Sequence, residues 1–122
     1  MAKTRILIAD DEEGIRESLS LILSDLYDLD FAHDGEETLS KASKGTHDLV
    51  LLDIKMPKLD GLEVLRQLKA KKFSKPVLVL TAYQSVELAR EAVKLGAQNY
   101  LPKPFEREQI LNAVKGALLP SK

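Results

Sequence analysis

The sequence predicts an α/β fold in which parallel strands alternate with helices. Two patterns support this prediction: short continuous apolar runs rich in β-branched residues, and apolar stripes with helical spacing between those runs. The two patterns alternate along the whole chain, which is typical of a parallel sheet covered by helices on both faces.

The predicted strands differ in character, and the difference indicates their places in the sheet. Continuous apolar runs suit central strands buried on both faces, and they occur at residues 6–9, 49–52 and 77–80. Residues 28–33 alternate polar and apolar side chains, as an edge strand with one solvated face would. Residues 98–101 form a weaker fifth candidate, which we place at the other edge.

Apolar stripes with helical spacing predict the first, fourth and fifth helices. The stripes comprise Ile15, Leu19, Ile22, Leu23 and Leu26, then Val86, Ala89, Ala92 and Val93, and finally Ile110, Leu111, Val114 and Leu118. Two capping-box patterns, Asp34 with Glu37 and Asp60 with Glu63, predict where the second and third helices begin. Gly96 is the predicted C-terminal cap of the fourth helix.

Right-handed crossovers leave few topologies for five such strands. With strands two and five at the edges, the order is 2-1-3-4-5, which is that of a flavodoxin-like (βα)5 doubly wound parallel sheet. In such sheets, ligands bind outside the carboxyl ends of the strands, near the switch point between strands one and three. Polar residues at that edge are therefore the candidates for a functional site.

Length and composition limit the class of protein. The chain has 122 residues, and we expect one domain over residues 1–122. Its formal net charge is −1, and no basic patch with interleaved aromatic residues stands out, which argues against nucleic-acid binding through bulk charge. Cysteine is absent, which excludes disulfides and thiolate zinc sites. Neither a signal peptide nor a membrane span is predicted, so we expect a cytoplasmic protein.

Polar side chains follow the predicted strands at their carboxyl ends. The first strand is followed by Asp10, Asp11 and Glu12, the third by Asp53, the fourth by Thr81 and the fifth by Lys103. Each has an ordinary alternative. Asp10 or Asp11 could cap the first helix, and Asp53 could simply enter a loop. Thr81 could cap the next helix, and Lys103 could be a solvated lysine. The combination, not any single residue, indicates a site.

Converging carboxylates need a compensating cation. Three carboxylates in a small site repel one another, and at least one keeps its proton unless a cation is present. Oxygen ligands favour a hard divalent cation such as Mg²⁺. His33 and His47 are expected to be solvated loop or strand-end residues, which disfavours zinc and copper. With Mg²⁺ and Lys103 nearby, Asp53 would stay ionised and attack a phosphoryl group.

These residues occur in motifs that resemble a CheY-like receiver domain of a two-component response regulator. The motifs are IADDEE at 8–13, LLDIKMPKLDG at 51–61 and LTAYQSVELAREAVKLGAQNYLPKPF at 80–105. The resemblance covers essentially the whole chain. The third motif is most similar to receivers of nitrogen-regulation-type transcriptional activators.

The resemblance implies a role for each matching residue at the metal and phosphate site. Asp53 would accept phosphate from a phosphohistidine on a sensor histidine kinase or histidine phosphotransferase. Asp11 would bind Mg²⁺ directly and Asp10 largely through water, with the backbone carbonyl of Lys55 as the third protein ligand. Lys103 would pair with the phosphoryl oxygens.

The resemblance also implies a phosphorylation switch. Thr81 would hydrogen-bond a phosphoryl oxygen, and Tyr100 would turn inward behind it. The surface of the fourth helix, fifth strand and fifth helix would then change shape and be read by a downstream protein or output domain. The same surface is compatible with a monomer or a weak homodimer.

Further details follow from the same motifs. The Lys103–Pro104 bond is expected to be cis, and Ala82 is small enough to leave a path for the attacking group. Pro57 and Gly61 are expected to shape the loop after the nucleophile, with Gly61 supplying backbone freedom.

Lys55 and Tyr83 flank the expected phosphate position. A cation and a bulky ring there would hinder attacking water, which suggests a long-lived phosphoryl group. The alternative is that both side chains lie on the surface with little effect. Gln84 stands where the nitrogen-regulation type often has glycine, which suggests a less mobile start of the fourth helix.

Three other functions compete with the receiver interpretation. A hydrolase of the haloacid-dehalogenase type needs a second acid two residues after the nucleophile, and Lys55 occupies that place. A nucleotide or flavin module needs a Gly-rich loop after strand one, whereas DDEEG repels phosphate. A phosphorylation-independent pseudo-receiver interaction module is the remaining alternative. Such modules usually lack a key residue, and this chain has them all.

Overall fold

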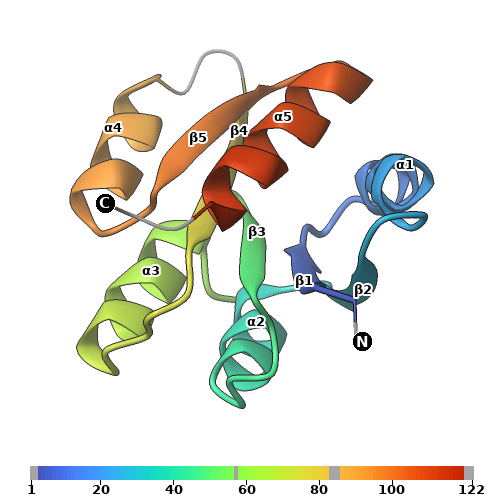
Figure 1. The fold of residues 1–122 in the computed structure, drawn as a ribbon. Helices are drawn as coiled ribbons and strands as arrows, with labels where there is room; N and C mark the ends of the chain where they lie inside the picture. The colour runs from blue at the N-terminus through green and yellow to red at the C-terminus, as the bar shows by residue number, and fades with distance from the viewer. Residues whose placement is uncertain (1–2, 57, 83–85, 120–122) are drawn as a thin grey trace.

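The computed structural model describes residues 3–56, 58–82 and 86–119, apart from the side chains of Ala82 and Val86. Strands and helices alternate along the chain (Figure 1). The strands are β1 (Arg5–Ala9), β2 (Asp28–Ala32), β3 (Leu49–Asp53), β4 (Val77–Ala82) and β5 (Asn99–Lys103). The helices are α1 (Glu13–Leu23), α2 (Gly35–Ala42), α3 (Gly61–Ala70), α4 (Val86–Lys94) and α5 (Arg107–Leu118). Within the described ranges, no helix has the length and apolarity needed to cross a membrane.

The strands form one parallel sheet in the order β2-β1-β3-β4-β5. This order confirms the predicted flavodoxin-like topology, with β2 and β5 at the edges. Every residue of β3 is buried, as expected of a strand covered on both faces. The connection from β1 to β2 and the return to β3 create the switch point at the carboxyl edge.

Alternate residues of each strand contact opposite layers of helices. Leu7 and Val50 belong to a cluster completed by α2, α3 and α4, whereas Ile8 and Leu51 belong to one completed by α1 and α5. Figure 1 shows α1 and α5 together on one side of the sheet. The central strands are therefore held from both faces, which fixes the residues at their ends.

Three strands extend beyond their predicted ends. β3 includes Asp53, and the ladder pairs it with Leu80. β4 continues to Ala82 and β5 to Lys103, and these two residues are also paired. Apolar runs do not mark these ends, because backbone hydrogen bonding continues under polar side chains. Asp53, Thr81 and Lys103 are thus strand residues and not loop residues.

The structure confirms one of the two hydrogen bonds in each predicted capping box, the bond in which the cap side chain accepts from a backbone N–H of the helix. Asp34 Oδ1 accepts a hydrogen bond from the Glu37 backbone N–H (2.8 Å), and Asp60 Oδ1 accepts one from Glu63 (2.9 Å). The reciprocal bonds differ from the prediction. The Glu37 carboxylate accepts from the backbone N–H of His33 (2.6 Å), and the Glu63 carboxylate pairs with side chains one turn along α3. The Glu37 carboxylate therefore binds a donor that precedes its cap residue, and the Glu63 carboxylate binds donors that follow its cap residue.

Two apolar residues lie outside the predicted buried stripes. α1 ends before Leu26, which is 58% exposed because the chain has already turned toward β2. Val93 is 43% exposed, although Ala89 and Ala92 on the same helix are buried. Gly96 has a φ of 112° just after α4, as predicted for a C-terminal cap.

His47 is buried, contrary to the sequence-based expectation that it is solvated. It is 3% exposed, and its Nε2 lies 3.0 Å from Asp30 Oδ2. Its Nδ1 is buried without a hydrogen-bond partner among the residues that the structure describes. Asp30 also accepts from Lys41 Nζ (3.2 Å), so the histidine belongs to a polar network at the β2 edge. His33 is exposed as expected and lies 2.8 Å from Glu37.

Two glycines hold the loop between β3 and α3. A Cβ added to Gly61 would overlap the carbonyl oxygen of Asp53, and one added to Gly35 would overlap the carbonyl of Leu59. The Gly61 N–H donates to the Ile54 carbonyl (2.6 Å). Gly61 has no positive φ, so the predicted need for backbone freedom was wrong. Glycine is needed there because the backbone of the Asp53 strand end lies in contact.

We expect Gly61→Ala to lower the free energy of unfolding by about 2 kcal/mol, because the new methyl group overlaps the backbone at Asp53. Gly116→Ala is the matched control, since nothing lies within 4 Å of an added Cβ at that helical position. Alanine should there raise stability by about 0.5 kcal/mol or more. Urea denaturation measures both changes, and a Gly61→Ala protein as stable as the wild type would contradict the contact.

Candidate functional site

Asp53 is fixed at the carboxyl end of β3. Its backbone pairs in register with Leu80, and the following N–H, that of Ile54, donates to the Leu80 carbonyl (3.1 Å). Asp53 is 5% exposed, and its Oδ1 accepts from the backbone N–H of Lys55 (3.4 Å). These contacts exclude the alternative of a loop-entry residue. The sheet presents this carboxylate at the switch point in a defined position.

The Lys103 ammonium connects three carboxylates. Its Nζ lies 2.8 Å from Asp10 Oδ2, 3.4 Å from Asp53 Oδ1 and 3.5 Å from Glu12 Oε1. Because β4 separates β5 from β3, the lysine side chain reaches across the end of β4 to make these contacts. Lys103 is therefore an ion-pair residue at the site and not the solvated lysine of the alternative reading.

Asp10 is the fully buried acid of the site. Its backbone N–H donates to the Ala32 carbonyl (3.1 Å), and its Oδ1 accepts from the Glu12 N–H (3.0 Å). Arg16 Nη1 donates to the Asp10 carbonyl (2.7 Å), which connects the end of β1 to α1. The N-cap residue of α1 is Glu12, so neither Asp10 nor Asp11 caps this helix.

A hollow of about 260 Å³ opens between these side chains. It is lined by Asp11, Glu12, Asp53, Ile54, Lys55, Thr81 and Lys103. Thr81 is buried inside β4, and α4 begins only at Val86, so Thr81 does not cap that helix. The structure thus brings the residues predicted from four strand ends around one opening, with Asp10 buried beside it.

Burial raises the pKa of Asp53 from 3.8 to about 7, and the negative charge of Asp10 adds to the effect. The Lys103 ammonium and the Lys55 N–H act in the opposite direction without outweighing it. Burial works to lower the pKa of Lys103, but its hydrogen bond to Asp10 and the charges of the surrounding carboxylates raise that pKa. One ammonium therefore leaves excess negative charge at this edge, which favours a further cation.

The donor atoms suit a hard divalent cation. One carboxylate oxygen each from Asp10, Asp11 and Glu12 lie within 4.8 Å of one another. All are oxygen donors, and Asp53 faces the same hollow. Mg²⁺ prefers such oxygen ligands, and softer metals prefer nitrogen and sulfur. The residues present therefore fit the predicted magnesium ion.

The other predicted positions are placed as follows. Tyr100 on β5 is 38% exposed, and Lys55 is exposed at the mouth of the hollow. The Lys103–Pro104 peptide bond is cis, as the resemblance implied. Outside the described residues lie Pro57, Tyr83, Gln84 and the side chain of Ala82.

Sequence reasoning assigned no role to two residues that contact the site. Glu12 pairs with Lys103, and Arg16 supports the backbone of Asp10. The signal for Glu12 was its position in the acidic run after strand one. Arg16 follows Glu12 by one helical turn and so shares its side of α1. This spacing was the only cue to its contact.

The response regulator receiver domain family model matches residues 6–115. Among curated proteins, the response regulators MprA of Mycobacterium avium (strain 104) and Mycobacterium tuberculosis (strain ATCC 25618 / H37Rv) are each 44% identical over 119 residues. The aligned region is 97% of this chain and 52% of each relative. The chain thus spans about half the length of the curated relatives it matches.

Solved structures share the fold. Chemotaxis protein CheY4 of Vibrio cholerae superposes with a TM-score of 0.87 at 33% identity, covering 96% of this chain and 100% of that one. CheY in the CheX-CheY-BeF3-Mg+2 complex from Borrelia burgdorferi superposes with a TM-score of 0.90 at 28% identity, covering 98% of this chain and 92% of that one. NtrX from Brucella abortus superposes with a TM-score of 0.88 at 32% identity, covering 97% of this chain and 27% of that one. Identity to MprA is higher than to NtrX, so the comparisons do not single out the nitrogen-regulation type.

We expect Asp53→Asn to stabilise the metal-free protein at high pH. The folded-state pKa of Asp53, about 7, lies above its ordinary value of 3.8, so the folded state holds a proton that the unfolded state releases. The stability this provides is present at low pH and is lost as pH rises through 7.

In EDTA, the free energy of unfolding of Asp53→Asn should therefore exceed that of the wild type by about 2 kcal/mol at high pH. This gain in stability should shrink toward zero in mild acid. Urea denaturation across this pH range measures the difference. Asp25→Asn, at an exposed acid outside the site, is the control. A gain for Asp53→Asn that does not change with pH would contradict the raised pKa.

Proposed function

From the premise that this chain belongs to the response regulator receiver domain family, we propose that it accepts a phosphoryl group onto Asp53. The donor is a phosphohistidine on a sensor histidine kinase or histidine phosphotransferase. The chain acts as a signalling phospho-acceptor that catalyses its own phosphoryl transfer and slow dephosphorylation. The supporting observation is that Asp53, Thr81 and Lys103 line one hollow with Asp10 buried beside it.

The chemistry is a displacement at phosphorus. A carboxylate oxygen of Asp53 forms the new O–P bond while the P–N bond to the donor imidazole breaks, and the imidazole keeps the electron pair. Lys103, already 3.4 Å from Asp53 Oδ1, offsets negative charge on the phosphoryl oxygens. The Thr81 hydroxyl donates a hydrogen bond to one of those oxygens.

Magnesium would be held by Asp11 directly, by Asp10 largely through water, by Asp53 and by the backbone carbonyl of Lys55. When bound, Mg²⁺ supplies charge neutralisation to the phosphoryl oxygens. Burial and the negative charge of Asp10 raise the pKa of Asp53, and a cation bound at the site would offset both effects and keep Asp53 ionised. Glu12 completes the acidic cluster and pairs with Lys103.

Phosphorylation would act as a two-state switch. The phosphoryl group adds about two negative charges, which favour the state in which Thr81 reaches toward it. Tyr100, now 38% exposed, then turns inward behind Thr81. The surface formed by α4, β5 and α5 changes shape and is read by a downstream protein or output domain. Full reversal of such an equilibrium needs about 5 kcal/mol of differential affinity.

The wider assignment follows from the same proposal. Residues 1–122 form one receiver domain that works in the cytoplasm as a monomer or weak homodimer through the α4, β5 and α5 surface. It makes no direct contact with nucleic acid or membrane as part of this function. The alternative, a phosphorylation-independent pseudo-receiver interaction module, is an outcome of the test below.

We expect incubation with acetyl phosphate and Mg²⁺ to add one phosphoryl group, detected by intact mass spectrometry. Asp53→Asn should abolish the adduct because it removes the attacking carboxylate. Addition of EDTA should abolish it as well, because the site then lacks the cation.

Asp48→Asn is the matched control, since Asp48 precedes the same strand, β3, but lies at its other end. It should be phosphorylated like the wild type. No adduct on the folded wild-type protein under any condition, or an adduct that persists in Asp53→Asn, would favour the interaction module.

We expect Lys55→Asn to shorten the phosphoryl lifetime by about fivefold, equivalent to about 1 kcal/mol in the barrier, because a cation at the mouth of the hollow hinders water. Lys58→Asn, in the same loop but outside the hollow lining, is the control. Autodephosphorylation followed by mass spectrometry after acetyl phosphate removal measures both. Adding Tyr83→Ala to Lys55→Asn tests the second flanking residue. Unchanged rates in all variants would show that both side chains lie on the surface with little effect.

A further inference from the structure

A second charged region lies at the end of the molecule opposite Asp53. α3 runs antiparallel to the strands, so its C-terminal end lies beside the start of β4 and away from the carboxyl edge. This basic end consists of the exposed lysines Lys44, Lys69, Lys71, Lys72 and Lys75. Lys71 Nζ donates to Ser43 Oγ (3.3 Å), which joins the ends of α2 and α3.

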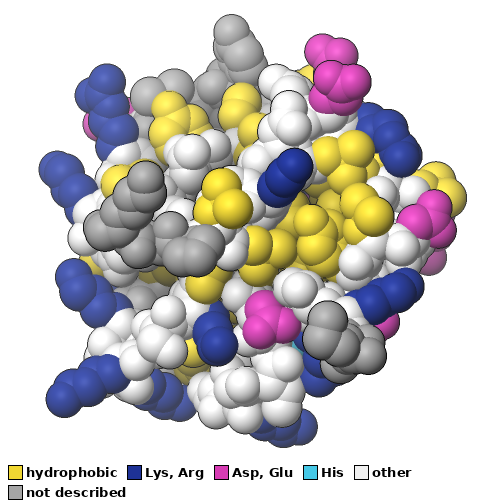
Figure 2. Space-filling model, in the orientation of Figure 1, with side chains coloured by type: hydrophobic (Ala, Val, Ile, Leu, Met, Phe, Trp, Pro, Cys, Tyr) yellow, Lys and Arg dark blue, Asp and Glu magenta, His cyan; other side chains and the backbone are white. Residues whose placement is uncertain are grey.

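No acid offsets these charges locally. Residues 64–86 contain five basic side chains and no aspartate or glutamate, although the whole chain has a net charge of −1. Within the described part of the chain, no carboxylate lies within ion-pair distance of the five lysines of the basic end. In Figure 2, Lys and Arg side chains line the lower left and lower edges of the molecule, where Figure 1 places α3 and α2. A positive potential therefore covers this end.

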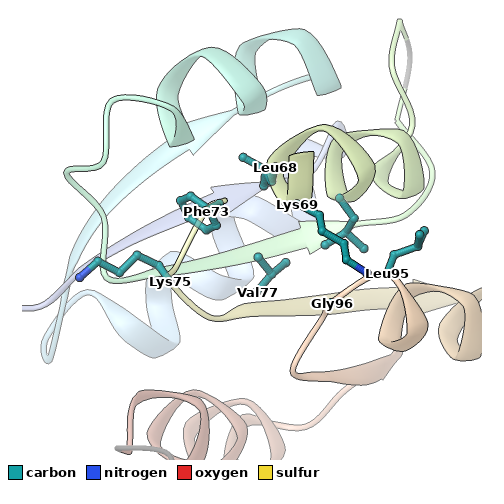
Figure 3. Close-up of a pocket in the computed structure, with 8 residues that line it drawn as sticks. Leu68, Lys69, Phe73, Lys75, Val77, Leu95 and Gly96 are labelled. Carbon is teal, nitrogen blue, oxygen red and sulfur yellow. The ribbon is translucent and has the colours of Figure 1, made fainter. Parts of the chain in front are cut away.

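An apolar hollow lies within the basic end. It measures about 100 Å³, and its lining consists of Leu65, Leu68, Lys69, Phe73, Lys75, Val77, Leu95 and Gly96. In Figure 3, Leu68, Phe73 and Val77 surround the opening, while Lys69 reaches across toward Leu95 and Lys75 extends outward. A second hollow of about 260 Å³ shares Leu68, Phe73 and Lys75 with the first. Phe73 thus borders two hollows whose linings both include lysine side chains.

We propose that the basic end binds an acidic polypeptide segment of a partner protein, with one aliphatic side chain of that segment inserted beside Phe73. The carboxylates of the segment meet the five lysines. The first hollow is smaller than the roughly 150 Å³ cavities that hold benzene, so it fits one short aliphatic side chain. The apolar side chains in the lining of this hollow favour a peptide with an aliphatic side chain over a nucleic acid, which would contact the lysines alone.

Most of this surface comes from one stretch of the chain, because four of its five lysines and Phe73 lie within residues 69–75. The net charge of −1 over the whole chain hides this local cluster of lysines around Phe73. The structure adds the segment after α2, because Ser43 and Gly45, the neighbours of Lys44 in the chain, line one hollow together with Lys71, Lys72 and Phe73. The inference does not rest on phosphoryl transfer, since the basic end lies at the opposite end of the sheet from Asp53.

The test uses two synthetic peptides as probes, one with a central leucine flanked on both sides by alternating Asp and Glu, and the same peptide with serine in place of leucine. Amide chemical shifts of the ¹⁵N-labelled protein report the location and affinity of binding. The variant Lys69→Glu/Lys75→Glu removes two lysines of the hollow. The matched control Lys3→Glu/Lys115→Glu makes the same charge change at an exposed terminal lysine and in the last turn of α5.

We expect the leucine peptide to shift the amides of residues 68–77 and 95–96 and to bind about tenfold more tightly than the serine peptide. Lys69→Glu/Lys75→Glu should weaken binding about tenfold, and the control pair and Asp53→Asn should leave it unchanged. Equal loss in both double variants would overturn the proposal, because it would show non-specific charge attraction. Tighter binding of a single-stranded oligonucleotide than of the leucine peptide would overturn it in favour of a nucleic-acid surface.

Discussion

The Lys103 ammonium is the contact on which the carboxyl edge depends. Without it, no ion pair between described residues would offset the carboxylates of Asp10, Asp53 and Glu12. Parallel strands are spaced about 4.8 Å apart, so the lysine on β5 must cross roughly twice that distance to reach β3. A long, flexible cationic side chain meets this requirement, and the strand order places it on the correct side. The charge balance of the site therefore depends on the strand order, which places Lys103 within reach of the three carboxylates.

The parts of this structure that the sequence predicted are those set by local periodicity. Apolar runs identified the central strands, and alternation identified the β2 edge, so the order of the sheet followed. The residues after each strand then identified Asp10, Asp53, Thr81 and Lys103, because parallel strands bring their carboxyl ends together. What was not predicted depends on contacts between distant segments. The burial of His47 beside Asp30 and the overlap that makes Gly61 necessary are two such contacts, and neither leaves a local pattern.

The distribution of charge follows from the direction of the helices. Each helix runs antiparallel to the strands, so helix N-termini lie at the carboxyl edge and helix C-termini at the other end. Acidic residues such as Glu12 and Glu13 lie near the first, and Lys69 and Lys71 near the second. This is the arrangement that helix dipoles favour. A chain with almost no net charge thus has two ends of opposite sign, each suited to a different kind of ligand.

Asp10 also specifies how β1 pairs with its neighbours. Both faces of β1 are buried in apolar side chains, so apolar character alone does not distinguish the observed register from one shifted by one residue. The acid at the end of the strand removes this ambiguity. A slip in one direction would bring Asp10 into the apolar interior, and a slip in the other would move it away from the Ala32 carbonyl and Lys103. A residue that contributes charge to the site therefore also favours the observed register of the first strand.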